Sequence, residues 1–498
     1  MREAPGMTSD DGTGPAAEPA PDAEADRPGR PRQAAPTPRV APDLTRFGPR
    51  EVLRAAEIGL VLWSHVAWAV VAALPRLLRR RGTARAVLAE AASHGVVQAL
   101  MALGPTFVKF GQMIASSPGM FPATLADACL RTLDDVDPYP AEQALAIVEQ
   151  DLGASADELF AEFDPEPLAS ASIAQVHACV LRDGRHAVLK VQRPDITAIM
   201  HRDLRILYRI ARLVDRTERG HLLNMPGVVE DMHQVTNEEL NFTLEAHRQA
   251  EFRAHIGDFG DNKWITAPDV YWDHCGPRVI CMERLHGTPM DRFDELRRRG
   301  VDGELVLRRG VKVWMEAALV HGPFHGDVHA GNLWVLDDGR AAYLDFGIMG
   351  ELPPAHRQAV LDVQYTTMID RDYTRIVRAW RSIGILPPDG GSEEEVAARL
   401  QMVIDPMLNL KLGEVSVAET FRQQIELQHE LGARAARELV LMTKQMMYFE
   451  RYAKELAPEY NMSGDLFLVR NIFPAEVARL VEERGVTLPD DSIPNVVP

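Results

Sequence analysis

Cysteine is scarce in this chain, and the few cysteines present are not spaced as a metal or redox site. Only four occur among 498 residues, and none forms a Cys-x-x-Cys pair: Cys129, Cys179, Cys275 and Cys281. A disulfide framework and a cysteine-based metal site are therefore not expected. Isolated core thiols in a reducing compartment fit the pattern.

An excess of positive charge is also missing. Lys and Arg number 54 against 72 Asp and Glu, which gives a formal net charge of −18. A polyanion would be repelled by such a chain, so nonspecific nucleic-acid binding is not expected. The apolar fraction of 46% and the charged fraction of 25% are ordinary for a globular protein. The length predicts one large two-lobed unit or two to three domains.

Large apolar residues are nearly absent from positions 1–45, which hold nine prolines. Such a segment cannot bury enough surface to offset the entropy lost on ordering. We therefore predict a disordered tail over residues 1–45. The segment has no hydrophobic run, so it is not a secretory signal.

Long hydrophobic runs are few. The run over residues 58–74 has no formal charge, but it falls short of the roughly 20 apolar residues that span a bilayer. A helix lying on the membrane surface is favoured, with the arginines at 76, 79, 80 and 81 meeting anionic head groups. A buried helix and a true span are the alternatives. No later segment is expected to approach membrane-spanning length, so we expect a cytoplasmic protein attached peripherally to a membrane.

Hydrophobic periodicity gives the order of elements along the rest of the chain. Residues 86–153 have helical spacing, and residues 168–192 alternate as a hairpin that turns at Asp183-Gly184. Helical spacing returns over 196–252. A short buried strand at 278–287 then runs into a connector, and helical spacing resumes after residue 350. The methionines at 442, 446 and 447 recur at helical spacing and predict a core-facing helix.

Three polar side chains in residues 324–347 carry the main chemical signal. Asp327 and Asn332 fit the pattern D-x-x-x-x-N, in which the carboxylate orients an acceptor hydroxyl and the amide binds a metal ion. The chain then turns at Asp338-Gly339 and returns Asp345, in Asp-Phe-Gly, to the same end. Asn332 and Asp345 are hard oxygen ligands that suit Mg²⁺ together with nucleotide phosphates.

A lysine within the hairpin completes this pattern. The parts of the chain follow the order found in protein-kinase-like folds: Lys190, a helix, a strand and connector, and then the Asp/Asn and Asp-Phe-Gly residues. A zinc site is the alternative for this region, because His325 and His329 flank Asp327. We favour the nucleotide site, since its geometry accounts for Asp327 and no further ligand cluster is near.

Two departures from protein kinases point away from peptide substrates. Gly326 stands where an arginine usually orders a phosphorylated activation loop. The chain after Gly347 also enters a helical pattern almost at once, with little left to build a peptide platform. Protein-kinase activity in trans is therefore not expected, and the His-Gly-Asp form is similar to that of aminoglycoside or choline phosphotransferases.

Several motifs resemble the UbiB/AarF family of atypical kinase-like proteins, which is associated with isoprenoid-quinone biosynthesis. They are "GPTFVKFGQ" (104–112), "ASASIAQVH" (169–177), "HAVLKVQRP" (186–194) and "EELNFTLEA" (238–246). The resemblance covers about residues 90–360 and is specific, because Lys-x-Gly-Gln before an Ala-rich loop is not a general kinase feature. It implies a two-lobed protein-kinase-like α+β fold with an N-terminal helical extension and a C-terminal helical elaboration.

The resemblance also implies roles for individual residues. Mg²⁺ and ATP or ADP are the expected cofactors, with Asp327, Lys190 and Glu245 as catalytic residues and Asn332 and Asp345 as metal ligands. The nucleotide would contact Lys190, Glu283 and the Ala-rich loop: Ala169, Ser170, Ala171, Ser172, Ile173 and Ala174. Lys109, Gly111, Gln112 and Glu239 would form the regulatory extension. We favour Glu245 as the partner of Lys190 and Glu239 as that of Lys109, although the exchange is also open.

The chain departs from the family pattern in three places. Asn241 replaces the acidic residue of Glu-x-Asp, and "MIASSPGMFP" (113–122) replaces Ser-x-Arg-Pro-Asp after Gly-Gln. The family's C-terminal transmembrane pair is not visible. Methyl groups in the Ala-rich loop would also restrict positive φ angles and hinder close approach to phosphates, so we expect altered ATP handling.

The predicted domains follow from these motifs. They are a tail (1–45), an apolar and basic helix (46–85), the helical extension (86–165), a kinase-like N-lobe (166–287), a C-lobe with added helices (288–475) and a polar tail (476–498). The expected function is Mg-nucleotide binding with ATPase or small-molecule kinase-like activity in isoprenoid-quinone or prenyl-lipid metabolism. Expected partners are an adenine nucleotide, a lipid or quinone-precursor ligand, a membrane surface and proteins of quinone biosynthesis. A small-molecule phosphotransferase and a catalytically silent nucleotide-gated scaffold are the alternatives.

Overall fold

The computed structural model describes residues 43–79, 84–115, 121–130, 137–217, 224–408, 437–490 and 492–496. These ranges all lie within one unit, Pro38–Pro498. The predicted disordered tail lies outside the described residues apart from positions 43–45, so it stays a prediction.

A four-stranded antiparallel sheet contains the lysine of the predicted site. Its strands are β1 (Phe160–Ser170), β2 (Ala174–Leu181), β3 (His186–Gln192) and β5 (Val279–Glu283), in the order β1-β2-β3-β5. The predicted hairpin is confirmed as β2–β3. At its turn Gly184 has a φ of +87°, which glycine adopts without steric cost. The strands begin at Phe160, ahead of the change in sequence pattern near residue 168.

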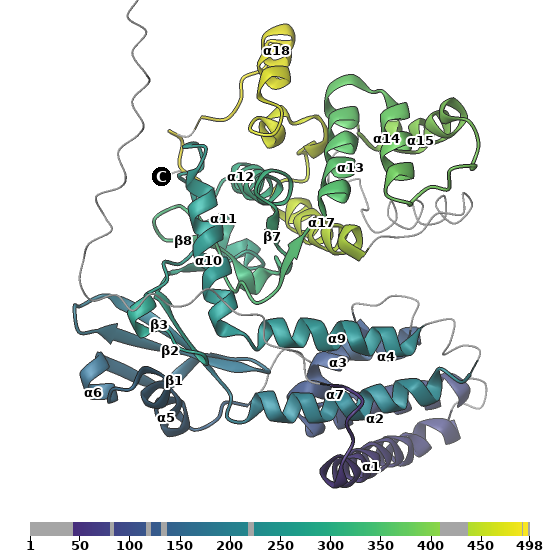
Figure 1. Ribbon diagram of the computed structural model, residues 1–498, viewed down its shortest axis with the longest axis vertical. Helices are drawn as coiled ribbons and strands as arrows, with labels where there is room; N and C mark the ends of the chain where they lie inside the picture. Colours follow the sequence, from purple (N-terminus) through teal and green to yellow (C-terminus); the bar gives the residue numbers. More distant parts are fainter. Residues whose placement is uncertain are drawn as a thin grey trace, which may run out of the picture. The chain divides into compact units, whose positions relative to one another are not determined.

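Different helices cover the two faces of this sheet (Figure 1). Val148 of helix α5 (Ala141–Leu152) and Leu189 belong to the core on one face, whereas Phe242 of α10 (Phe242–Gly257) and Ile280 belong to the core on the other face. Side chains alternate between the faces of a strand, so Lys190, next to Leu189, points toward α10. The pleat of β3 therefore directs the lysine at the helix that carries Glu245.

A helical layer packs beside this sheet around its own apolar core, and it includes helices from outside the predicted extension (86–165). Its helices are α1 (Pro49–Arg79), α2 (Ala84–Leu103), α3 (Pro105–Ala115), α4 (Ala123–Leu130), α7 (Ile196–Val214) and α9 (Met225–Glu239). Phe107 and Leu204 are buried in the core that these helices share. A two-point ion pair joins α1 to α7, because Arg54 Nε and Nη2 lie 3.0 and 3.1 Å from the two carboxylate oxygens of buried Asp203.

The C-lobe holds the second part of the predicted site. Its small sheet has the order β4-β9-β8-β6, with β4 (Ile265–Thr266), β6 (Gly287–Pro289), β8 (Leu333–Leu336) and β9 (Ala341–Tyr343). A separate pair joins β7 (Pro323–His325) to β10 (Met349–Glu351). The predicted return hairpin is therefore confirmed as β8–β9, and it packs over a core that contains Trp314, Tyr343 and Phe346.

Helices surround these strands. They are α6 (Ala156–Leu159) in the N-lobe, and α11 (Phe293–Arg298), α12 (Gly303–Glu316), α13 (Pro354–Tyr365), α14 (Tyr373–Ser382), α15 (Glu393–Leu408), α17 (Arg437–Leu456) and α18 (Pro474–Arg484) in the C-lobe. Short 3₁₀ or π segments are η1 (Trp272–His274), η2 (Ala317–His321), η3 (Ala330–Asn332), η4 (Thr366–Asp370), η5 (Met462–Gly464) and η6 (Leu466–Val469). Within the segment predicted as a polar tail, Val477 and Leu480 are buried in the C-lobe core.

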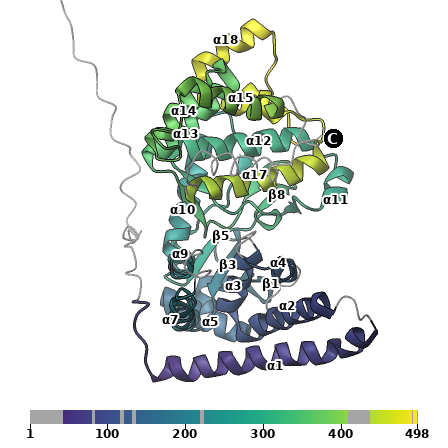
Figure 2. The same cartoon turned by 90° about the vertical axis from the view of Figure 1, so that its right-hand side faces the viewer.

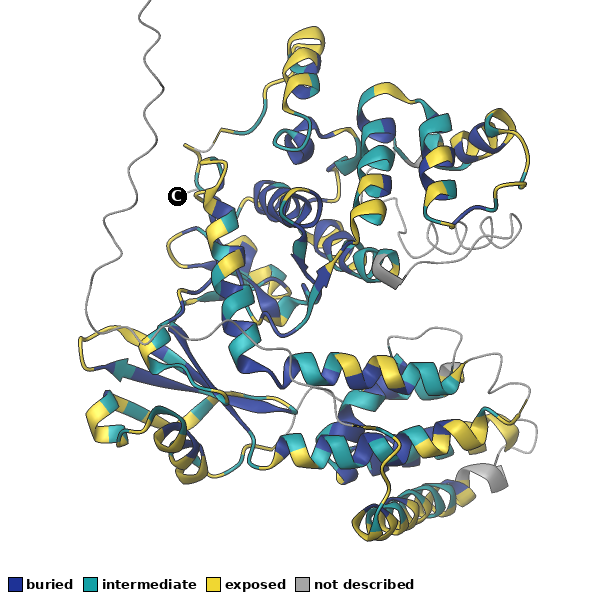
Figure 3. Cartoon of the chain, in the orientation of Figure 1, coloured by how far each residue is buried: buried dark blue, intermediate teal, exposed yellow. Residues whose placement is uncertain are grey.

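Helix α1 presents a largely apolar face to solvent. Figure 2 shows α1 lying along α2, and Figure 3 shows exposed residues along its outer side. Trp63 and Trp68 are 71% and 76% exposed, whereas Ile58 on the packed side is 3% exposed. The apolar residues of this outer face are Leu53, Leu60, Trp63, Trp68, Val71 and Leu74. The arginine side chains at positions 76, 79, 80 and 81 lie outside the described residues.

Within the part of the chain that the structure describes, two helices, rather than one, are long and apolar enough to cross a membrane by length and composition. They are Pro49–Pro75 and Ala84–Leu103, whose 18-residue windows have mean hydropathies of 1.8 and 1.4. The expectation that no segment after residue 74 approaches this length was therefore wrong. Many small residues make up the second helix, and their modest individual hydropathies add up over 20 positions.

Candidate phosphoryl-transfer site

Lys190 lies between two carboxylates that come from different parts of the chain. Its Nζ is 2.6 Å from Glu245 Oε1 on α10 and 3.0 Å from Asp345 Oδ2, two residues beyond β9. The Lys190 and Glu245 side chains are 9% and 1% exposed, whereas that of Asp345 is 48% exposed. The three residues therefore connect the sheet, α10 and the Asp-Phe-Gly segment, and the open side of Asp345 is free to face a ligand.

The charges of this triad are strongly coupled. Burial alone would lower the pKa of Lys190, but the two carboxylates outweigh it and raise that pKa above its ordinary value. Burial raises the pKa of Glu245 to about 7, although Lys190 partly offsets the shift. Burial acts in the same direction on Asp345, but Lys190 prevails and lowers the pKa of Asp345 to about 2. At neutral pH the lysine is cationic and Asp345 is fully ionised.

The backbone of Asp345 is held in an uncommon conformation. Its φ is +55°, a left-handed value that costs energy for a residue other than glycine. Gly347 N–H donates to Asp345 Oδ1 at 3.2 Å, and the next side chain, Phe346, is buried against Phe252 and His325. Phe346 anchors the segment in the core, so the Asp345 carboxylate keeps its direction although its backbone conformation is uncommon.

The loop that carries Asp327 is connected to this segment by hydrogen bonds. Asn332 Nδ2 donates to the Asp327 carbonyl oxygen at 3.0 Å, and Leu344 N–H donates to the Asn332 carbonyl oxygen at 2.8 Å. With the amide nitrogen of Asn332 occupied by the loop, its side-chain oxygen is the atom left for a metal ion. Asp345 and Asn332 thus supply the oxygen donors that Mg²⁺ prefers.

Of the two flanking histidines, His325 serves the loop, which argues against the zinc alternative. His325 is fully buried, with Nε2 2.9 Å from the Leu344 carbonyl oxygen and Nδ1 3.2 Å from Asp327 N. This pattern fixes a neutral ring with the proton on Nε2, and burial lowers the pKa of His325. Both nitrogens are occupied, so His325 has no lone pair for a metal. His329 Nε2 lies 3.5 Å from Asp327 Oδ2.

The Ala-rich loop closes the end of the β1–β2 hairpin. Ala169 and Ser170 end β1, Ala174 begins β2, and Ala171, Ser172 and Ile173 form the turn. Arg193 fixes this turn from the end of β3: its Nε donates to the Ala171 carbonyl oxygen at 2.9 Å and its Nη2 to Ser170 Oγ at 2.8 Å. The loop is therefore restrained by side-chain contacts as well as by its alanines.

Glu283 ends β5, where the strand meets the connector to the C-lobe. Its side-chain Oε2 accepts from Asp269 N at 3.2 Å and lies 3.6 Å from Arg253 Nη1. The carboxylate is thus engaged by the protein, so a nucleotide contact at this position would use the backbone. Its predicted nucleotide contact stays a prediction.

The extension contributes a second ion pair next to the triad. Lys109 on α3 pairs with Glu239 at the end of α9. Glu239 lies beside the Asp-Phe-Gly segment, because a Cβ on Gly347 would be 3.8 Å from Glu239 Cγ. Gly111 is buried and Gln112 is exposed. The favoured assignment, Glu245 to Lys190 and Glu239 to Lys109, is the pairing found in the structure.

Asn241, the departure from Glu-x-Asp, has a local structural role. It is the N-cap of α10, and its side chain accepts from Leu244 N–H at 3.2 Å. Asn caps a helix about as well as Asp does. The substitution therefore keeps the start of the helix that carries Glu245 while removing one negative charge.

Sequence reasoning missed a cation at this site. Lys444 on α17 lies with its Nζ 3.1 Å from Asp327 Oδ1, and the neighbouring Gln445 side chain bonds to the backbone of Gly326 and Val328. The methionine spacing predicted only a core-facing helix here. Met442 and Met446 do pack on the C-lobe core, whereas Met447 is 41% exposed. No local motif marks a lysine that acts at a distance of 117 residues along the chain.

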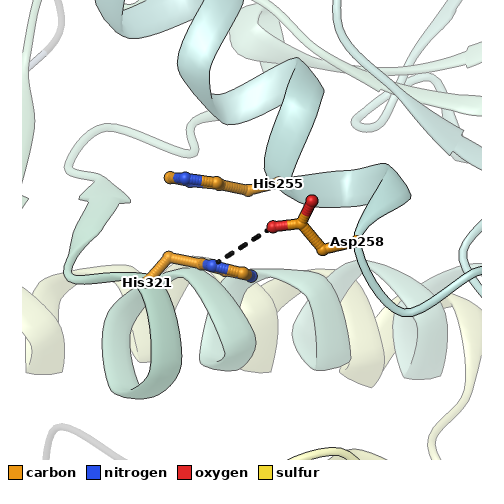
Figure 4. A group of neighbouring side chains, drawn as sticks. All are labelled: His255, Asp258 and His321. Carbon is orange, nitrogen blue, oxygen red and sulfur yellow. Dashed lines mark ion pairs between the residues drawn. The ribbon is translucent and has the colours of Figure 1, made fainter. Parts of the chain in front are cut away.

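A second group of potential ligands lies apart from these residues (Figure 4). One ligand atom from each of His255, Asp258 and His321 lies within 4.8 Å of the others, and Asp258 Oδ2 is 3.6 Å from His321 Nδ1. The two imidazole rings are stacked at 4.1 Å with only 7° between their planes. Since imidazole lone pairs lie in the ring plane, parallel rings do not direct both toward one ion. The group joins the end of α10 to η2.

Comparisons with known proteins show which family the chain resembles. Residues 131–380 match the ABC1 atypical kinase-like domain, and residues 400–461 match the UbiB helical domain, which includes Lys444. An uncharacterized protein of Mycobacterium tuberculosis is 37% identical over 416 residues, which are 83% of each chain. A protein of Azotobacter vinelandii named probable protein kinase UbiB is 33% identical over 369 residues, or 73% of this chain and 68% of that one.

A solved structure of the Rv3197–erythromycin complex from Mycobacterium tuberculosis covers 65% of this chain and 84% of that chain at 22% identity. Its TM-score is 0.44, which is too low to add to the family match. The domain match and the mixed helix–strand structure confirm the kinase-like fold that the motifs predicted. The chain belongs to the UbiB family of ABC1 atypical kinase-like proteins.

Proposed function

We propose that the chain binds Mg²⁺ and ATP or ADP at the Lys190–Asp345 site and has ATPase or small-molecule kinase-like activity. The observation that supports this most directly is Lys190 bridging Glu245 at 2.6 Å and Asp345 at 3.0 Å. Such a bridge places one ammonium group between α10 and the predicted metal ligand. In kinase-like phosphoryl transfer, the ion pair between this lysine and the helix glutamate and the binding of Mg²⁺ by the Asp-Phe-Gly aspartate must both be in place.

Each residue of the site has a role in this proposal. Asp345 and Asn332 would hold Mg²⁺, which would neutralise phosphate charge when bound. Lys190 neutralises the α- and β-phosphates, and Asp327 orients an acceptor hydroxyl or a water molecule. On transfer, the bond from the γ-phosphorus to the ADP oxygen breaks and a bond to the acceptor oxygen forms. The acceptor proton passes to the Asp327 carboxylate.

Peptide substrates are disfavoured in this proposal for a geometric reason. The strand β10 follows Gly347 after one residue and pairs with β7, and α13 starts at Pro354. Little chain is left there for a peptide platform, while the Lys109–Glu239 pair lies beside the Asp-Phe-Gly segment. A small acceptor or water therefore fits the site better than a protein chain.

Thermal-shift titration with ADP and ATP, with and without Mg²⁺, tests the proposed binding. Assays of phosphate release, with and without anionic liposomes, and of phosphorylated product then separate the three alternatives. An ATPase releases phosphate without an acceptor, a small-molecule phosphotransferase yields a phosphorylated alcohol, and a silent scaffold shows the thermal shift with no turnover. A chain that shows no Mg²⁺-dependent shift with either nucleotide would exclude the proposal as a whole.

The metabolic role rests on family membership. We propose that the activity supports isoprenoid-quinone or prenyl-lipid metabolism, with a lipid or quinone precursor as ligand and proteins of that pathway as partners. Deleting the gene and profiling the quinones tests this role separately from the chemistry. An unchanged quinone content would contradict the pathway while leaving the nucleotide site in place.

The exposed apolar face of α1 supports peripheral attachment of a cytoplasmic protein to a membrane. Replacing both Trp63 and Trp68 by Ser should weaken binding to anionic liposomes by roughly 10-fold or more, because binding scales with the apolar area that enters the interface. Co-sedimentation measures this. Met402→Ser is the matched control, since Met402 is 70% exposed on α15. Equal losses in both variants, or no loss in either, would contradict a membrane-binding face on α1.

The pH dependence of the site should follow Glu245. The pKa of Glu245 is about 7 in the folded protein and 4.5 in the unfolded chain. Between pH 4.5 and 7, Glu245 therefore holds a proton more tightly in the folded protein than in the unfolded chain. This group's contribution to stability therefore falls as pH rises from about 4.5 to 7, while its ion pair with Lys190 forms. Phosphate release should rise with pH through about 7. Glu245→Gln should flatten the rise of phosphate release with pH. If the rise persists in this variant, the pH dependence belongs to another group.

A further inference from the structure

Helix α17 is fixed to the loop that carries Asp327 by buried hydrogen bonds. Gln445, which is fully buried, donates from Nε2 to the Gly326 carbonyl oxygen at 2.7 Å and accepts from Val328 N–H at 3.0 Å. Tyr452 OH donates to the Val328 carbonyl oxygen at 2.9 Å. Two side chains thus bind the backbone on both sides of Asp327, and they set the distance of this helix from the reacting position.

Lys444, next to Gln445, places a positive charge at that position. Its Nζ is 3.1 Å from Asp327 Oδ1, and its side chain is 37% exposed. Burial opposes the charge, but Asp327, with smaller contributions from Tyr448 and Glu239, outweighs burial and raises the pKa of Lys444 above its ordinary value. The ammonium is therefore charged at neutral pH and lies near both the loop that carries Asp327 and Glu239 of α9.

The charges around the site show what this cation can do. Three lysines pair with four carboxylates here: Lys109 with Glu239, Lys190 with Glu245 and Asp345, and Lys444 with Asp327. Residues 328–331, between Asp327 and Asn332, contain no Lys or Arg. A γ-phosphate that reached Asp327 would meet a like charge, and phosphoryl transfer generally requires a cation on the transferred group. Lys444 is the ammonium group placed at this carboxylate.

We propose that Lys444 is the γ-phosphate-binding lysine of this site, supplied by the C-terminal helical domain. Without nucleotide, its ammonium neutralises Asp327. With Mg-ATP bound, it contacts the γ-phosphate and keeps that group from being repelled by Asp327. The inference rests on the proposed function and deepens it, because it makes the helical domain part of the site.

A purely structural role for Lys444 predicts different behaviour. The helix is already attached through Gln445 and Tyr452, and the Lys444 contact is the more exposed one. Replacing a lysine with a structural role would weaken the binding of ADP and ATP alike, since both nucleotides need the same fold. Replacing a lysine that contacts the γ-phosphate would weaken the binding of ATP only, because ADP lacks that group.

The test compares Lys444→Met, Lys444→Arg and the control Lys454→Met in the full chain. Lys454 lies ten residues further along α17, pairs with Glu450 at 2.6 Å and is 39% exposed, so it matches Lys444 in burial and in being paired. We expect Lys444→Met to weaken Mg-ATP binding by roughly 10- to 100-fold, the usual effect of losing a charged hydrogen bond. Mg-ADP binding should change less than about 2-fold, Lys444→Arg should retain part of the preference for ATP, and Lys454→Met should resemble the parent protein.

The outcomes are distinguishable. If Lys444→Met binds Mg-ATP as the parent protein does, or loses ATP and ADP binding equally, the inference is overturned while the nucleotide site stands. If the parent protein binds neither nucleotide, the proposed function itself fails. Melting temperatures of all variants without nucleotide check that the fold is intact. Where turnover occurs, Lys444→Met should also lower kcat for phosphate release more than Lys454→Met does.

Discussion

Replacing Asp345 by Asn should abolish the Mg²⁺-dependent stabilisation by nucleotide. Asp345 is one of two proposed protein ligands for Mg²⁺, and its carboxylate is ionised because Lys190 lowers its pKa to about 2. Losing even a residue that only supports a metal ligand typically costs 10- to 100-fold in affinity, so losing a ligand should cost more than about 100-fold. Titrating Mg²⁺ at a fixed ADP concentration and following the melting temperature measures this.

Asp338→Asn is a suitable control for that variant. Asp338 lies at the turn of the same β8–β9 hairpin, is 50% exposed and pairs with Arg340 at 2.7 Å. It matches the 48% exposure of Asp345 but lies at the opposite end of the hairpin. The control should keep a normal Mg²⁺-dependent shift. An Asp345→Asn protein that keeps the shift as well would remove the metal assignment.

Replacing Lys190 by Met should destabilise the folded protein as well as remove nucleotide binding. Glu245 would keep its carboxylate at 1% exposure with no cation beside it. Removing one partner of a buried ion pair typically costs about 3–5 kcal/mol, because the remaining charge is uncompensated. The loss should be largest near pH 8 and smaller near pH 5, where Glu245 takes up a proton. Urea unfolding at both pH values measures it.

A double variant separates the two effects of Lys190. In Lys190→Met/Glu245→Gln the buried carboxylate becomes a neutral amide of similar shape, so most of the lost stability should return. Nucleotide binding should not return, because the ammonium that neutralises the phosphates is still missing. If the double variant is no more stable than Lys190→Met, the buried charge of Glu245 is not the source of the destabilisation.

Much of the site could be predicted from the sequence because its parts have fixed local spacing. Asp327 and Asn332 are five positions apart, and a hairpin of known turn residues returns Asp345 to the same end. Alternation along β3 similarly fixes the face on which Lys190 lies. These features depend on backbone geometry within a few residues, and such geometry is encoded by residue type and period.

Contacts between distant elements were decided by the tertiary structure. The pairing of Lys190 with Glu245 spans 55 residues, that of Lys109 with Glu239 spans 130, and that of Lys444 with Asp327 spans 117. The sequence alone left the first two pairings open and gave no sign of the third. The exposure of the apolar face of α1 also depends on which helices cover its other side. Local propensity and spacing act along the chain, whereas partner choice between charges and the burial of a helix face depend on how separate elements pack. For this protein, the sequence determined which groups the site contains, and the packing of α3, α9, α10 and α17 decided which of them meet.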